Sequence, residues 1–88
     1  MDRATIISYL QAAEEHVANV ELKIANQRGL ISSLRRNGQD TSSATAELHL
    51  MEETHMQYIG DRNRLRTELA VLNAADAAKA RFTETRDP

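Results

Sequence analysis

Apolar residues in the first part of the chain recur in steps of four and three without a slip. Such alternation keeps one stripe of a helix facing a partner helix, as in coiled coils. We call this stripe the seam of the helix, and it predicts a helix over about residues 3–37. Eight of its nine positions are apolar: Ile6, Leu10, Ala13, Val17, Val20, Ile24, Ile31 and Leu34, with Gln27 the exception.

A second seam with the same alternation follows and predicts a helix over about residues 42–82. Its ends are apolar, whereas its middle carries the polar residues His55 and Arg62. Strand periodicity is absent over any useful length, so we expect an all-α protein. The second seam consists of Ala44, Leu48, Met51, His55, Tyr58, Arg62, Leu65, Leu69 and Leu72.

Residues 38–41 separate the two predicted helices. Gly38 can adopt the left-handed conformation that ends a helix, and Asp40 and Thr41 can accept hydrogen bonds from the first N–H groups of the next. So short a connection predicts two long antiparallel helices, a coiled-coil hairpin that comprises residues 1–88 as one unit. Alanines after residue 73 favour helix, and we expect a frayed tail over residues 83–88.

The register of the hairpin stays open between two alternatives. Centring the hairpin on Gln39 pairs Leu34 with Ala44 and brings Leu10 near Leu69. A slide by one helical turn instead pairs Gln27 with His55 in a polar layer. Both registers preserve the steps of four and three.

One narrow seam leaves other apolar residues without cover. A core of this size is marginal on its own, and burial of half of these residues at about 25 cal/mol per Å² would favour association. We therefore expect a homodimer in which two hairpins form a four-helix bundle. The residues concerned are Ile7, Leu22, Leu30, Leu50, Met56, Ile59 and Val71.

Composition narrows the possible classes of function. The 88 residues hold 11 Lys and Arg against 13 Asp and Glu, a net charge of −2, which argues against a nucleic-acid partner. No cysteine is present, which excludes disulfides, thiolate metal ligands and a cysteine nucleophile. No apolar run reaches the roughly 18–20 residues of a membrane span, so we expect a cytoplasmic protein that does not bind membranes.

Three polar residues occupy seam positions, namely Gln27, His55 and Arg62. One interpretation is a polar layer that sets the register, which we favour. The other is a layer that binds a ligand or responds to pH, because histidine titrates near physiological pH. For Arg62 a third option is that its stem packs while its charged head reaches water.

Glu52 and His55 lie three residues apart, the spacing of one ligand pair in di-iron bundles. Glu14 or Glu21 could complete such a site in a dimer. However, the three carboxylates flank the seams rather than occupying them, so a metal site is only an alternative. We predict no catalytic residue, no bound metal and no cofactor.

The run Arg62, Arg64 and Arg66 could contact phosphate or nucleic acid. Helical positions two apart point about 200° away from each other, so the three do not form one patch. We expect a solvated charged face, with Glu68 pairing with Arg64 across one turn.

Several segments resemble a family of short helical-hairpin proteins of α-proteobacteria, found in rhizobia and their relatives. The resemblance covers roughly residues 12–70, is most specific at 37–41, and rests on Gln27-Arg28, on Leu34 to Thr41, on Glu52-Glu53 and on Asp61-Arg62-Asn63-Arg64-Leu65. It implies a helical hairpin of bacterial, cytoplasmic origin. The family has no established activity, so the resemblance assigns no site residue.

The sequence thus predicts a non-enzymatic protein that acts by self-association or by binding another protein. The second option would be an adaptor whose exposed apolar stripe docks a helix of an unidentified regulatory partner.

Overall fold

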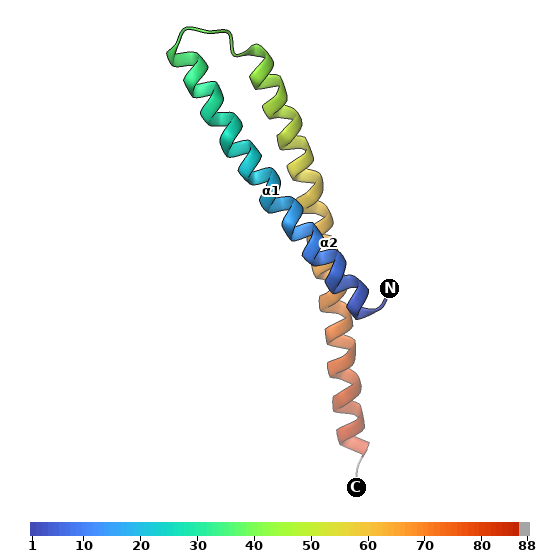
Figure 1. The fold of residues 1–88 in the computed structure, drawn as a ribbon. Helices are drawn as coiled ribbons and strands as arrows, with labels where there is room; N and C mark the ends of the chain where they lie inside the picture. The colour runs from blue at the N-terminus through green and yellow to red at the C-terminus, as the bar shows by residue number, and fades with distance from the viewer. Residues whose placement is uncertain (87–88) are drawn as a thin grey trace.

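The computed structural model describes residues 1–86, and their side chains as far as Arg81. Two helices account for nearly all of this part of the chain: α1 (Arg3–Arg36) and α2 (Ser42–Arg86), with no strand among the described residues. The helices run antiparallel and pack along their length (Figure 1). The predicted all-α hairpin is therefore confirmed.

Two backbone hydrogen bonds and the conformation of Gly38 form the turn that ends α1. The Gln39 N–H donates to the Leu34 carbonyl at 2.9 Å and the Gly38 N–H to the Arg35 carbonyl at 3.1 Å, the pair of bonds of a Schellman motif. Gly38 has a φ of 69°, the left-handed conformation that this motif needs and that glycine adopts without strain. The sequence prediction for this helix end is confirmed.

An aspartate shortly before each helix accepts hydrogen bonds from the first residues of that helix. Asp2 accepts from the Thr5 N–H at 2.8 Å, and Asp40 accepts from the Ser42 hydroxyl at 2.7 Å and the Ser42 N–H at 3.0 Å. The side chain and the backbone N–H of Thr5 lower the pKa of Asp2, and those of Ser42 lower the pKa of Asp40. Both side chains therefore stabilise the folded state more when they are ionised than when they are protonated.

The end of α2 differs from the prediction. We expected the helix to end near residue 82 and a frayed tail over 83–88, but α2 continues to Arg86, and residues 87–88 lie outside the described part. No glycine or proline interrupts residues 61–87, so nothing local stops the helix. Arg3, the first residue of α1, forms an ion pair with Asp76, and about ten residues of α2 extend beyond this point (Figure 1).

The predicted seams form the contact between the helices. On α1 the seam is buried from Ile6 to Ile31, with only Leu10 and Leu34 half-buried. On α2 only Ala44 and Leu65 are buried. The other predicted seam residues of α2 are half-buried: Leu48, Met51, His55, Tyr58, Arg62, Leu69 and Leu72.

The observed register is the one centred on Gln39. Leu10 and Leu69 pack in one apolar cluster around Ile6 and Leu65. Closer to the turn, Gln27 contacts α2 at Ala44. The alternative register, which pairs Gln27 with His55, is wrong, because Gln27 bonds to Ala44 and Glu47, nearer the turn, and His55 lies 4.0 Å from Glu21 instead.

The hairpin is long and thin. It measures 79 × 19 × 14 Å and has a radius of gyration of 21.2 Å, against about 12 Å for a compact domain of this length. Its accessible surface is 6,645 Å², whereas a compact monomer of this mass exposes about 5,200 Å². Each chain therefore exposes on the order of 1,400 Å² more than a compact monomer would.

Candidate interaction surfaces and polar seam residues

Gln27 is the buried polar residue of the α1 seam. Its side chain is 8% exposed, and its amide nitrogen donates to the Ala44 carbonyl at 2.8 Å and to a Glu47 carboxylate oxygen at 3.2 Å. A buried amide without partners would cost roughly 1–3 kcal/mol, so these bonds favour this register over its neighbours. The contacts are those of a residue that positions the two helices.

His55 lies further along α2 and has a different neighbour. Its Nε2 atom is shielded from water and forms no hydrogen bond with any described residue. The nearest acidic group is the Glu21 carboxylate of α1, 4.0 Å away. Gln27 and His55 therefore do not share a layer, and each meets its own partner on the opposite helix.

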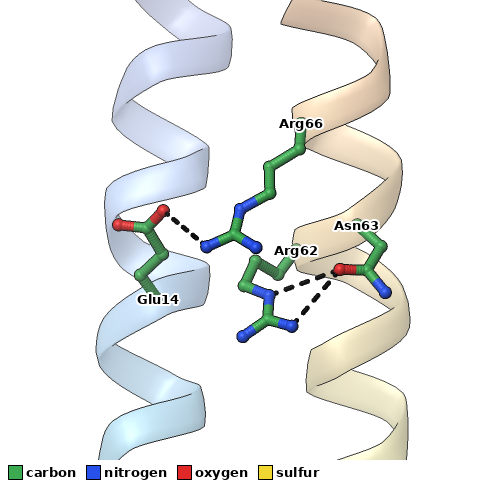
Figure 2. A network of polar contacts seen from close by, with 4 residues as sticks. All are labelled: Glu14, Arg62, Asn63 and Arg66. Atoms are coloured by element: carbon green, nitrogen blue, oxygen red, sulfur yellow. Dashed lines mark hydrogen bonds and ion pairs between the residues drawn. The ribbon is translucent and has the colours of Figure 1, made fainter.

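Arg62, the third polar seam residue, directs its head group along its own helix. Its Nε and Nη2 atoms donate to the Asn63 side-chain oxygen at 3.4 and 3.3 Å (Figure 2). Next to it, Arg66 reaches across to α1 and donates to Glu14 at 3.5 Å (Figure 2). Half-burial of Arg62 with a solvated head matches a stem that packs and a charge that reaches water. The three seam residues thus lie at three separate levels of the hairpin.

The residues of the metal alternative come together only in part. Glu21, Glu52 and His55 line one open groove between the helices. Glu52 forms an ion pair with Arg28 at 3.8 Å, and Glu14 is held by Arg66. Among the side chains described, those of residues 1–81, no three acidic or histidine groups converge as a possible metal cluster.

The arginine run on α2 does not form a common anion site among the described residues. Arg62 contacts Asn63 and Arg66 contacts Glu14. Arg64 forms an ion pair with Asp61 at 3.2 Å, rather than with Glu68, the partner that the helical spacing allowed. The i,i+3 spacing of Asp61 and Arg64 serves as well as i,i+4, which is why sequence alone did not separate the two partners.

One side of the hairpin is joined by ion pairs between the helices. Glu14 meets Arg66, Glu21 lies near His55, and Arg28 meets Glu52. Residues seven apart follow the same edge of a helix, so these groups border one side of the interface. We call this side the ion-pair flank: Ile7, Glu14, Glu21 and Arg28 of α1 with Glu52, Ile59 and Arg66 of α2.

The opposite side of the interface has no ion pair between the helices among the described residues, and this side was not predicted from the sequence. We call it the Lys23 flank: Tyr9, His16, Lys23 and Leu30 of α1 with Glu47, Thr54, Asp61 and Glu68 of α2. Here the His16 ring packs at 4.9 Å from the Tyr58 ring. The seven-residue recurrence of Tyr9, His16, Lys23 and Leu30 is the signal that could have revealed this flank.

Three open hollows lie between the helices on the Lys23 flank, and one of them is bordered by Tyr9, His16, Asp61 and Glu68 of the flank itself. The other two are lined by a larger share of apolar residues. One is lined by Val20, Lys23, Leu50, Met51, Thr54 and Tyr58. The other lies nearer the chain start and is lined by Met1, Ile6, Thr67, Glu68, Val71 and Leu72. Exposed Leu50 and Val71 stand at the rims of these hollows, so apolar side chains meet solvent beside apolar depressions.

Comparison with known proteins adds no relationship: no protein-family model, curated protein or solved structure matches the chain. The resemblance to the α-proteobacterial hairpin family therefore stays a prediction. As for membranes, neither helix offers, in the residues described, an apolar stretch long enough to cross a bilayer.

Proposed function

We propose that this chain is a non-enzymatic interaction protein that self-associates, with two hairpins forming an antiparallel four-helix bundle. The observation that carries the proposal is the set of large apolar side chains left in solvent, between 38% and 72% exposed. They are Met1, Ile7, Tyr9, Leu22, Leu30, Leu50, Met56 and Val71.

The surface area supports the same proposal. Each chain exposes on the order of 1,400 Å² beyond a compact monomer, whereas each partner in a standard protein interface buries about 800 Å². A second hairpin laid along the first could cover this excess without any change in the fold. Burial of apolar surface at about 25 cal/mol per Å² would favour that arrangement.

The polar seam residues fit a structural role in this proposal. Gln27 and Arg62 have hydrogen-bond partners within the hairpin. The bond from Gln27 to Ala44 aligns the two helices, and the bond from Arg62 to Asn63 stays on α2, which fits structural rather than catalytic roles. We assign no catalytic residue. A cytoplasmic location belongs to the proposal too, and cell fractionation would test it.

Sedimentation equilibrium tests the proposal directly. We expect a mass of two chains over about 1–100 µM, a range that brackets a micromolar dissociation constant. The measurement is repeated near pH 5.5, where a dimer that persists would be consistent with a structural role for His55 and the other histidines. A single-chain mass at every concentration would contradict self-association and would direct attention to a helix of another protein as the occupant of the exposed surface.

A further inference from the structure

We infer that a second copy of this chain binds on the Lys23 flank and not on the ion-pair flank. The inference rests on the proposed self-association and specifies its surface. Four observations carry it: the distribution of charge, the exposed apolar residues, the hollows and the excess area.

The charges of the ion-pair flank are already used within one hairpin. Arg66 and Arg28 each hold a carboxylate of the other helix, and His55 lies 4.0 Å from Glu21. A partner docking there would have to desolvate these pairs, and desolvation often costs as much as the pairs contribute. This flank is therefore a poor place for a second hairpin.

The Lys23 flank offers charges of both signs that remain available. Neither Lys23 nor Glu68 forms an ion pair with another residue in the described part of the chain. In a two-fold dimer the same surface occurs on both subunits, so it has to complement itself. A flank that carries a free lysine and a free glutamate satisfies this condition.

Apolar side chains supply the anchors on this flank. Tyr9, Leu30, Leu50 and Val71 are each at least 46% exposed, and all four lie on or beside the Lys23 flank. In helix bundles such side chains enter depressions between the residues of the facing helix. The hollows on this flank are depressions of that kind, so one surface holds both the side chains that insert and the depressions that receive them.

The test compares two lysine substitutions on α2. Leu50 beside the Lys23 flank is 63% exposed, and Met56 beside the ion-pair flank is 72% exposed. Lysine favours helix about as well as leucine and methionine, so neither change should disturb the hairpin itself. We expect Leu50→Lys to weaken the dimer by at least about tenfold, and Met56→Lys by less than about twofold.

A second pair on α1 makes the result independent of any one variant. Leu30→Lys changes the Lys23 flank, and Leu22→Lys changes the side of α1 that faces away from α2, where the residue is 62% exposed. Sedimentation equilibrium gives the dissociation constants, and circular dichroism confirms that each variant is helical. We expect Leu30→Lys to weaken the dimer and Leu22→Lys to leave it unchanged.

The outcomes separate this inference from the proposed function. A wild-type monomer at every concentration would overturn both. A wild-type dimer that Met56→Lys dissociates, while Leu50→Lys and Leu30→Lys do not, would keep self-association and overturn the assignment of the flank. Dissociation by the two Lys23-flank variants alone would support both.

Discussion

The two helices of the hairpin share one pattern but bury it to different depths. On α1 seven residues of the seam are buried, whereas on α2 only Ala44 and Leu65 are. Apart from Gln27, the α1 seam consists of short and branched side chains, and most of them are buried in the contact. The α2 seam carries Met51, Tyr58 and Arg62, whose longer side chains reach its edges. Most of the buried core therefore comes from α1, whereas the seam of α2 remains partly exposed and has apolar atoms available for further contacts.

Truncating one seam side chain on each helix tests the difference in burial most directly. We expect Ile24→Ala to lower the free energy of unfolding by about 3 kcal/mol, because a buried isoleucine leaves a cavity. Met51→Ala on α2 should cost about 1 kcal/mol, since Met51 is only half-buried. Urea titration at a fixed chain concentration measures both. Equal costs would contradict the asymmetry.

Glycine substitutions separate the backbone contribution from side-chain packing. A Cβ added at Gly29 of α1 or Gly60 of α2 would meet nothing within 4 Å. Alanine at either position should therefore raise the free energy of unfolding by about 0.5–1 kcal/mol, by the same amount in both helices. Gly38→Ala should lower it by about 1 kcal/mol, because φ is 69° there. A clear difference between Gly29→Ala and Gly60→Ala in thermal unfolding would place part of the asymmetry in the backbone.

Substitution of Gln27 tests which contacts determine the register of the two helices. Gln27→Met keeps the size of the side chain and removes both hydrogen bonds, so the free energy of unfolding should change by less than about 1 kcal/mol. The alignment of the helices should become less specific. Because the chain has no cysteine, spin labels at Ala18→Cys and Gln57→Cys report one cross-helix distance. We expect a single distance with Gln27 and a broadened distribution with methionine; an unchanged distribution would show that the turn alone sets the register.

Asp2 and Asp40, which precede the two helices, should make stability depend weakly on pH in acid. The pKa values of Asp2 and Asp40 are lowered in the folded state. Their contribution to stability is therefore complete above about pH 4, the ordinary aspartate pKa, and is lost as the pH falls through the folded values. Asp2→Asn and Asp40→Asn keep a capping side chain that does not titrate. Between about pH 5 and pH 2 each variant should lose less stability than wild type, measured by urea titration.

Much of the architecture could be predicted from sequence because local rules determine it. The steps of four and three place the seams, and Gly38 and Asp40 place the turn. The register could not be predicted, since both alternatives keep the same steps. It depends on how many residues the turn consumes and on the bond from Gln27 to Ala44, which are properties of the assembled hairpin.

The surfaces were harder to predict than the core. The charged residues of the ion-pair flank are visible in the sequence, but their partners depend on the register. Arg28 meets Glu52 and Arg66 meets Glu14 in the assembled hairpin, and sequence alone does not show which acid lies opposite which base. The Lys23 flank could have been found in advance, because Tyr9, Lys23 and Leu30 follow the seven-residue spacing.

The part of α2 beyond Asp76 gives this small protein two kinds of helix with different thermal behaviour. The stretch opposite α1 melts together with the packed contact. The last ten or so residues, about 15 Å of helix, lie beyond the start of α1, and Ala77, Ala78 and Ala80 favour helix there. Helix of that length is marginal in water by itself. Heating should therefore produce a gradual loss of ellipticity at temperatures well below the cooperative transition. The slope of that early loss reports how readily the segment of α2 beyond Asp76 unwinds.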